Sequence, residues 1–320
     1  MSEQHPVAVI GLGVMGQRML ANMHKYPGFE PVVVWDPDPQ ACRSTAERYP
    51  MLRVADSAND AITASNVACV YIACPPQHHY AAATEAFAAG KSVWCEKPLG
   101  VDAETSAALV SAATASGLAN IVNFSLASAI ATHELEGRLK RGALGEIQSI
   151  DLRLHFARWP RQWQEAASSW LSFRKEGGFT REVVSHWVYL TQRLFGTPVL
   201  EHARCRYPDA HHAETHLLAM LDVGGLPFSI AASSGGVGPD IVEYTVQGER
   251  GAFRIHDWNT ALVSDGHSWQ SCRDDIVDPR EAGYQAQLAN AANAIAGRAH
   301  TMPDFRFAFE VQTTIEAMLE

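Results

Sequence analysis

The chain has 320 residues, of which 47% are hydrophobic, and a formal net charge of −10 at pH 7. It is long enough to bury a large core, and its length favours two domains over one. The negative charge argues against nucleic acid and anionic membrane surfaces as partners, and no segment has the apolar length of a membrane helix. The N-terminus shows no signal sequence, and the six cysteines contain no C-x-x-C pair. These features predict a cytoplasmic protein with reduced thiols.

The first predicted strand, residues 7–10, runs directly into the glycine-rich turn G-L-G-V-M-G at residues 11–16, and a helix-like stretch follows to residue 26. This strand–turn–helix context is what a dinucleotide fingerprint requires. The first glycine allows the tight turn, the second lets pyrophosphate approach the backbone, and the third lets the helix pack on the strand. Phosphate would then meet the N-terminus of a helix. The turn therefore predicts cofactor contacts at Gly11, Gly13, Met15 and Gly16.

A second apolar run, residues 32–35, ends in Asp36, about twenty residues after the last glycine of the turn. An acidic side chain at this place holds the ribose hydroxyls of NAD. No arginine follows directly to receive a 2′-phosphate, and the carboxylate would repel one. The sequence thus predicts NAD as the cofactor, with NADP the less favoured alternative.

Short β-rich runs and helical stretches alternate up to residue 123, which predicts a doubly wound parallel sheet with its ligand at the carboxyl ends of the strands. The predicted strands of this part are residues 7–10, 32–35, 52–55, 68–73, 92–95 and 120–123. After a helix at 131–141, strand follows strand with short turns, which predicts a large, mostly antiparallel open sheet. Its predicted strands are residues 147–156, 200–207, 215–223, 228–232, 241–247 and 252–255. Two helices, 285–296 and 305–319, close the chain.

The predicted fold class is therefore α/β, with an N-terminal Rossmann domain at residues 1–123 and a C-terminal α+β domain at residues 124–320. The second domain is expected to bind substrate and to form oligomers. Its sheet has too few predicted helices to cover both faces, so the uncovered apolar face must be buried somewhere. A homodimer or homotetramer is expected. Its candidate contacts are Leu218, Met220, Phe228 and Ile230.

Two motifs lie at the ends of neighbouring predicted strands: Glu96-Lys97-Pro98, and the loop C-P-P-Q-H-H at residues 74–79. Together with the fingerprint and the antiparallel second half, they resemble the glucose–fructose oxidoreductase, inositol dehydrogenase and rhizopine-catabolism (Gfo/Idh/MocA) family over nearly the whole chain. The resemblance implies that Lys97 is a catalytic-site lysine, preceding a cis proline. It also implies that the loop lies by the nicotinamide, although Cys74 and Pro76 replace the usual Thr and Asn. The cofactor contacts that follow are Cys74, Pro75, His79, Glu96 and Lys97.

A second segment, G-G-F-T-R-E-V-V-S-H at residues 177–186, resembles the G-G-G-x-L-x-D-x-x-x-H segment of the same family. Glu182 stands where Asp is usual, and His186 matches the histidine. On a helix the two side chains are four residues apart and share one face. Histidine suits proton transfer because its pKa lies near neutrality. This segment and the Glu96-Lys97-Pro98 motif together predict Lys97, His186 and Glu182 as the catalytic set. The plainer alternative is that Glu182 and His186 form a surface helix pair.

Arginine and tryptophan are concentrated between residues 158 and 187, where four of the eight tryptophans lie. Guanidinium groups bind carboxylates in bidentate fashion, and indole rings pack on sugar faces, so the segment is predicted to line the substrate site. The alternatives are a subunit interface, in which both residue types are enriched, and a solvated loop. The predicted substrate contacts are Arg158, Trp159, Arg161, Trp170 and Arg181.

Adjacent histidines at 78–79 and 211–212 lack the spacing of a helical zinc pair, and no metal is predicted. The sequence as a whole indicates an NAD-dependent oxidoreductase acting on an alcohol or carbonyl carbon of a small polar substrate, such as a sugar, cyclitol or sugar acid. One alternative is an imine or keto-acid reductase whose arginines hold a carboxylate. Another is a non-catalytic NAD-sensing regulator of the same fold, because fold alone does not decide function.

Overall fold

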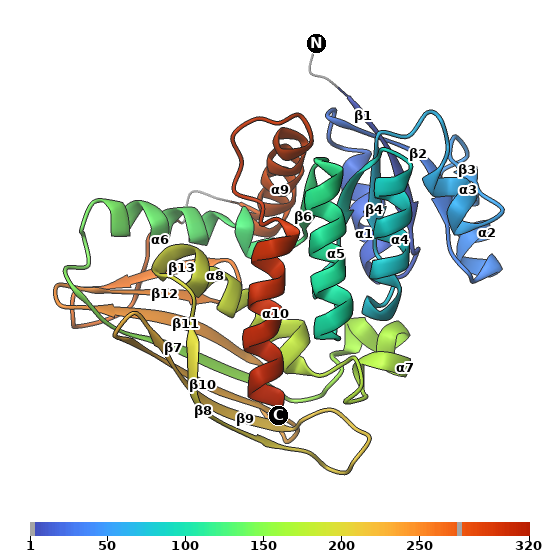
Figure 1. Cartoon of the computed structure of the whole chain (residues 1–320). Helices are drawn as coiled ribbons and strands as arrows, with labels where there is room; N and C mark the ends of the chain where they lie inside the picture. The colour runs from blue at the N-terminus through green and yellow to red at the C-terminus, as the bar shows by residue number, and fades with distance from the viewer. Residues whose placement is uncertain (1–3, 274–276) are drawn as a thin grey trace. The chain divides into compact units, whose positions relative to one another are not determined.

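The structure is a computed structural model that describes residues 4–273 and 277–320, and it divides into two compact units (Figure 1). The first unit runs up to Phe124 and includes Tyr284–Phe309, and the second contains Ser125–Gly283 and Glu310–Glu320. The sequence placed one boundary after residue 123 and assigned everything beyond it to the second domain. In the structure, residues 284–309 belong to the first unit instead. One of the contacts that join them to it is a hydrogen bond of 2.9 Å from Val122 N to the carbonyl of Pro303.

The first unit is built on a six-stranded sheet with the order β3-β2-β1-β4-β5-β6, and its paired strands are all parallel. The strands are β1 (His5–Ile10), β2 (Phe29–Trp35), β3 (Arg53–Val54), β4 (Cys69–Ile72), β5 (Ser92–Cys95) and β6 (Asn120–Val122). This confirms the predicted doubly wound sheet. All strand carboxyl ends lie at one edge, and the order reverses between β1 and β4, which is where such sheets bind their ligands.

Helices connect these strands, and right-handed crossovers place α1 and α2 on one face of the sheet and α4 and α5 on the other. Figure 1 shows α4 and α5 side by side. The helices of this unit are α1 (Val14–Met23), α2 (Pro39–Arg48), α3 (Ala58–Ile62), α4 (His79–Ala88), α5 (Ala103–Ser116) and most of α9 (Pro279–Ile295). Local sequence sets several of their starts. Asp102, for example, caps α5 by accepting a hydrogen bond from Thr105 N, 2.7 Å away.

The second unit is built on an eight-stranded sheet with the order β14-β13-β12-β11-β7-β10-β9-β8. Of the strand pairs described in this second sheet, only β7–β10 is parallel, so the predicted, mostly antiparallel sheet is confirmed. The strands are β7 (Ile147–Phe156), β8 (Val199–Arg206), β9 (His216–Val223), β10 (Leu226–Ser234), β11 (Ile241–Gly248), β12 (Ala252–His256), β13 (Thr260–Ser264) and β14 (Gln270–Ser271). The sequence missed β13 and β14: β13 has five residues, and β14 is a two-residue strand that pairs with it at the edge of the sheet.

Helices cover the inner face of this sheet, where the buried residues of each strand alternate with outward-facing ones. The helical segments are α6 (Ile130–Lys140), α7 (Ser168–Leu171), α8 (Ser185–Phe195), the end of α10 (Phe305–Leu319), the 3₁₀ turns Ser125–Ala127 and Gln162–Ala167, and the π turn Thr180–Val184. Helix α8 is buried on all sides up to Gln192, as expected of a central core helix.

The outer face of the same sheet carries large apolar side chains in solvent. Leu218 is 63% exposed and Met220 is 45% exposed. Phe228 and Ile230, which the sequence also offered as subunit contacts, are buried on the inner face instead. The reason is register: on β10 they alternate with outward-facing Ser229 and Ala231, and the period of a strand is two residues. Among the described residues, no helix is long and apolar enough to cross a membrane.

Candidate active site

The glycine turn between β1 and α1 has the geometry of a phosphate cradle. Gly11 has φ +96°, and a Cβ there would lie 2.6 Å from the carbonyl carbon of Ala73. A Cβ on Gly16 would lie 2.0 Å from the carbonyl oxygen of Gly11. At Gly13, the N-cap residue of α1, a Cβ would meet no protein atom within 4 Å. The first and third glycines are therefore required by the fold, whereas the second leaves open space at a helix N-terminus, where a phosphate binds.

This difference predicts separate outcomes for two matched substitutions. Gly13→Ala should leave the melting temperature of the ligand-free protein nearly unchanged and weaken NAD binding by at least about tenfold, because its methyl group fills the cradle. Gly16→Ala should lower stability by about 1–3 kcal/mol through overpacking. Thermal denaturation and titration with NADH fluorescence measure both effects. Unchanged NAD affinity in Gly13→Ala would contradict the cradle.

Asp36 follows β2 and is oriented by two backbone amides. Its Oδ2 accepts a hydrogen bond from Leu12 N at 2.6 Å, and its Oδ1 accepts one from Asp38 N at 2.8 Å. The first bond ties the carboxylate to the glycine turn itself. The acid that the sequence assigned to the ribose thus lies beside the predicted pyrophosphate site, as the fingerprint requires.

A buried polar network lies at the carboxyl ends of β4, β5 and β6. Glu96 is buried, and its Oε1 accepts hydrogen bonds from the hydroxyl of Tyr71 and from Asn123 Nδ2, the latter at 2.6 Å. Gln287 of α9 donates from Nε2 to Asn123 Oδ1 at 2.9 Å and to the carbonyl of Phe124 at 3.1 Å. Burial and the Glu96 carboxylate raise the pKa of Tyr71 well above its usual range, so the phenol remains a donor. The network holds the carboxyl end of β5 in place, and Lys97 lies two residues after this strand.

Lys97 is partly exposed and is joined to Pro98 by a cis peptide bond, as the family resemblance implied. Behind it, His79 is buried. Its Nδ1 lies 3.1 Å from the carbonyl oxygen of Pro98, and its Nε2 lies 2.9 Å from that of Cys74. His79 therefore joins the two loops that were predicted to line the cofactor, and both of its ring nitrogens face backbone carbonyls. His79 would therefore contribute to cofactor binding by holding these two loops together.

The remaining predicted cofactor contacts of this unit are Met15, Cys74 and Pro75. Met15 is in the first turn of α1, where its sulfur lies 3.6 Å from Arg18 Nη1. Cys74 and Pro75 follow β4. Burial raises the pKa of the Cys74 thiol to about 12, so it stays protonated at neutral pH and does not act as a nucleophile.

In the second unit, Glu182 lies in a π turn and not in the regular helix that the sequence predicted. The turn spans Thr180–Val184, and Ser185 N donates to the carbonyl of Thr180, five residues back. Single π turns inside helices are frequent at functional sites. The Glu182 carboxylate accepts a hydrogen bond from Gln164 Nε2 at 2.9 Å, and Gln164 Oε1 accepts one from Arg161 Nε, also at 2.9 Å. Gln164 is a buried residue that the sequence did not single out.

His186 follows in the first turn of α8 and is 7% exposed. Its Nδ1 lies 3.4 Å from the hydroxyl oxygen of Ser125. Its ring meets the indole of Trp258 edge to face, with centroids 5.3 Å apart. Neither neighbour could be found from spacing alone, since they lie 61 and 72 positions away along the chain. A nearly buried histidine with these two partners has a fixed ring, which proton transfer at a defined atom requires.

The glycine pair before the π turn is explained by its protein neighbours. Gly178 has φ +100°, and a Cβ there would lie 2.3 Å from Glu214 Oε2. Glu214 is buried and accepts a hydrogen bond from Thr180 N at 2.7 Å. Burial raises the pKa of this carboxyl above its usual value. Glu214 thus caps the start of the helical segment that carries Glu182 and His186.

Arg181, which the sequence assigned to the substrate wall, is a structural residue here. Its guanidinium is buried, and its Nε and Nη2 each lie 2.6 Å from one carboxylate oxygen of Glu316 in α10. Nη1 donates to the carbonyls of Arg174 and Gly177, at 2.7 and 3.1 Å. The sequence could not show this, because the partner carboxylate lies 135 positions away.

The other members of the arginine and tryptophan segment have different environments. Arg158 is exposed and pairs with Glu165 at 2.5 Å. Arg161 lies over the rings of Phe156, Trp159 and Trp163, at 4.7–5.8 Å from their centroids. Trp159 donates to the carbonyl of Leu171, and Trp170 is partly exposed. Among the predicted substrate arginines, Arg161 is linked to the predicted catalytic set by hydrogen bonds through Gln164 to Glu182.

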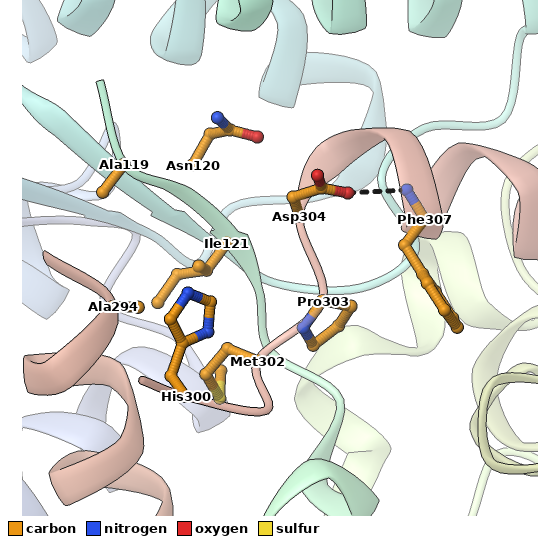
Figure 2. Close-up of a pocket in the computed structure, with 9 residues that line it drawn as sticks. All are labelled: Ala119, Asn120, Ile121, Ala294, His300, Met302, Pro303, Asp304 and Phe307. Atoms are coloured by element: carbon orange, nitrogen blue, oxygen red, sulfur yellow. Dashed lines mark hydrogen bonds between the residues drawn. The ribbon is translucent and has the colours of Figure 1, made fainter. Parts of the chain in front are cut away.

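A cavity of about 370 Å³ lies elsewhere in the first unit, between β6 and the segment that leads into α10 (Figure 2). Its lining includes Ile121, His300 and Met302, and Asp304 at its edge caps α10 by accepting a hydrogen bond from Phe307 N, 2.8 Å away. None of the predicted site residues lines it. Within residues 4–273 and 277–320, no three His, Cys, Asp or Glu side chains are grouped closely enough to hold a metal ion.

Comparison with known families decides the affiliation of both units. Residues 6–124 match the family described as "Oxidoreductase family, NAD-binding Rossmann fold", and residues 137–320 match the "Oxidoreductase family, C-terminal alpha/beta domain". The chain belongs to the Gfo/Idh/MocA oxidoreductase family. The resemblance read from the fingerprint, the Glu96-Lys97-Pro98 motif and the His186 segment is thereby confirmed. The first unit is an NAD-binding Rossmann domain.

Curated relatives include an uncharacterised oxidoreductase of Streptococcus pneumoniae serotype 4, 26% identical over 170 residues, or 53% of this chain and 44% of that protein. Another is an inositol 2-dehydrogenase of Rhodococcus erythropolis, 37% identical over 112 residues, or 35% of this chain and 32% of that protein. The matched region thus spans less than half of the length of these two relatives.

Solved structures share the fold over nearly the whole chain. A putative myo-inositol dehydrogenase from Sinorhizobium meliloti has a TM-score of 0.81 at 18% identity, with 98% of this chain and 96% of that chain covered. The WlbA dehydrogenase from Bordetella pertussis, solved with NADH and UDP-GlcNAcA, has a TM-score of 0.82 at 21% identity, with 99% and 95% covered. At these identities the likeness establishes the fold alone.

Proposed function

We propose that the protein is an NAD-dependent dehydrogenase or reductase that transfers a hydride between nicotinamide and an alcohol or carbonyl carbon of a small polar substrate, such as a sugar, cyclitol or sugar acid. One observation carries the proposal: a chain with an NAD-binding domain retains both the strand-end Lys97 before cis-Pro98 and the enclosed His186 on α8. The curated inositol 2-dehydrogenases among its relatives support the substrate class.

The open space at Gly13, the oriented Asp36 carboxylate and the loops at Cys74 and Lys97 would hold the dinucleotide. When bound, NAD supplies a hydride acceptor for an alcohol carbon, and NADH returns the hydride to a carbonyl. In the oxidation, His186 takes the hydroxyl proton as the C–H bond breaks and the C–O bond becomes a carbonyl. The Lys97 ammonium stabilises the negative charge that develops on the oxygen. Glu182, held by Gln164, orients the site without taking part in proton transfer.

A thermal-shift screen tests the proposal, with NAD or NADP crossed against myo-inositol, hexoses and sugar acids. A true ligand stabilises the folded protein by mass action, by about 2.7 kcal/mol at a hundred times its dissociation constant. The protein should then oxidise the compounds that stabilise its NAD complex, and the NADH formed is measured by its absorbance. Binding of NAD without turnover of any stabilising compound, in either direction, would favour the sensing regulator instead.

The arginines give less support to the alternative of a carboxylate-bearing keto-acid or imine substrate. Arg181 is engaged by Glu316, and Arg158 is paired with Glu165 on the surface. A guanidinium already bound to a carboxylate is poorly suited to bind a second one in bidentate fashion. Arg161 is the candidate that this alternative would need, and Arg161→Met should then raise the KM of such a substrate strongly.

Cofactor preference follows from Asp36. Because its carboxylate is fixed beside the glycine turn and would repel a 2′-phosphate, NAD should bind at least about tenfold more tightly than NADP, a difference of roughly 1.4 kcal/mol. Asp36→Ser should reduce the preference mainly by improving NADP binding. Fluorescence titration with NADH and NADPH measures both affinities. Tighter binding of NADPH by the wild-type protein would overturn the preference and direct attention to Arg43, which lies in α2 after Asp36.

The exposed outer sheet face of the second unit supports a symmetric homodimer or homotetramer. Leu218 and Met220 lie side by side in solvent on β9, and a face of this kind is buried in stable oligomers. Light scattering should give a multiple of the 34.9 kDa of one chain, and Leu218→Arg should shift the mass toward one chain. Ala219→Ser, on the buried face of the same strand, is the control that should keep the oligomer. A wild-type mass near one chain at micromolar concentration would contradict this proposal.

A further inference from the structure

Trp258 is an aromatic side chain in contact with His186. Their ring centroids are 5.3 Å apart and their planes are inclined by 89°, which is the edge-to-face arrangement that aromatic rings prefer. The same indole lies 5.3 Å from the ring of Trp187, which is fully buried and stacks on Tyr244 at an angle of 18°. Trp258 is therefore the outer end of an aromatic column that begins in the core of the second unit.

The backbone that carries Trp258 is unfavourable for its residue types. Asp257 has φ +46° and Trp258 has φ +70°, in the turn 257–259 between β12 and β13. These are the only positive φ values that the structure gives to residues other than glycine in 4–273 and 277–320. Fourteen glycines occupy this region elsewhere, because a Cβ is disfavoured there. A tryptophan at such a position indicates that its side chain is needed, since glycine would suit the backbone better.

Ser125 bounds the same imidazole on another side, with its hydroxyl oxygen 3.4 Å from Nδ1. The two neighbours act differently. The Ser125 hydroxyl lies within hydrogen-bonding distance of Nδ1, while the Trp258 indole restricts rotation of the whole imidazole ring. Together they restrict the plane of the imidazole and hence the direction of Nε2, the other ring nitrogen.

We propose that Trp258 is a positioning residue, which holds the His186 ring in the orientation that proton transfer requires. The inference rests on the proposed function only in assigning a proton to His186. Because an aromatic contact of this kind acts unequally on the neutral and the protonated ring, removing it should also change the pKa of His186 and the balance of its two tautomers.

The test uses ¹⁵N-histidine labelling of the whole chain and long-range ¹H–¹⁵N spectra recorded against pH, with His186 assigned by its loss in His186→Ala. Trp258→Gly relieves the backbone and removes the indole, and Trp258→Leu removes the indole alone. Both should shift the pKa of His186 by about half a unit or more and alter its tautomer ratio. Trp258→Phe should preserve both properties. Trp269→Leu is the control, because this tryptophan contacts Arg254 in the same unit.

An unchanged pKa and tautomer ratio in Trp258→Gly would overturn the positioning role, even if Trp258→Leu failed to fold. Kinetics separate this outcome from failure of the proposed function. With a substrate from the thermal-shift screen, Trp258→Gly should lower kcat about tenfold while the NADH dissociation constant stays unchanged. If His186→Ala retained full turnover, the proposed function would fail, and the spectra would still decide whether Trp258 holds the ring.

Discussion

Replacing His186 or Lys97 by alanine is expected to lower turnover by about a hundredfold or more while leaving NAD affinity nearly unchanged. A positioned acid–base group contributes about 10²–10⁴ to the rate, and a donor aimed at a developing negative charge contributes a similar factor. Steady-state rates and fluorescence titration of NADH on one preparation separate the two effects.

Conservative variants make this test sharper. His186→Gln keeps a side chain that can hydrogen-bond but cannot accept a proton near neutral pH, so it should be as inactive as alanine. Lys97→Arg keeps the charge in a different geometry and should recover part of the rate, which Lys97→Met should not. Full turnover in both alanine variants would remove His186 and Lys97 from the catalytic set. It would leave the NAD-binding domain without a chemical role assigned in this chain.

Features of the first unit were predictable because they are local. The run at residues 7–10, the glycine turn and Asp36 form a pattern of about thirty residues whose physical requirements are all backbone requirements. The structure adds the detail that Gly11 and Gly16 are needed by the fold and Gly13 is not. The sequence assigned these separate roles to the three glycines, but it could not identify the atoms that exclude a Cβ, which belong to Ala73 and to Gly11 itself.

Features of the second unit were harder to predict because its side chains meet across long stretches of chain. His186 was found from its motif, yet its neighbours Ser125 and Trp258 lie in a 3₁₀ turn and a hairpin turn that no local pattern connects to it. The sequence also did not predict the π turn. Because this turn contains one more residue than a turn of regular α-helix, the four-residue spacing of Glu182 and His186 does not by itself place them on one face. The concentration of arginines gave the least reliable prediction, because the role of an arginine depends on which carboxylate lies next to it. For Arg181 that carboxylate belongs to Glu316, 135 positions away in the sequence.

That weakness leads to a second large expected effect, on stability. Arg181→Met should destabilise the second unit by about 3 kcal/mol, because it removes a buried guanidinium and leaves the partly buried Glu316 carboxylate without its counterpart. At about 2–4 °C per kcal/mol for a domain of this size, the melting temperature should fall by roughly 10 °C. Arg181 also holds the carbonyls of Arg174 and Gly177, so its loss frees backbone acceptors near the start of the helical segment. Thermal denaturation followed by circular dichroism measures the change.

Two further variants decide between this structural role and the substrate role first predicted for Arg181. The double substitution Arg181→Met with Glu316→Leu should recover part of the lost stability, because it removes both charges and leaves apolar side chains of similar size. Arg158→Met, which breaks only an exposed pair, should cost less than about 1 kcal/mol. If Arg181→Met instead kept the wild-type melting temperature and raised KM alone, the guanidinium would belong to the substrate site. The pairing with Glu316 would then be one that substrate binding displaces.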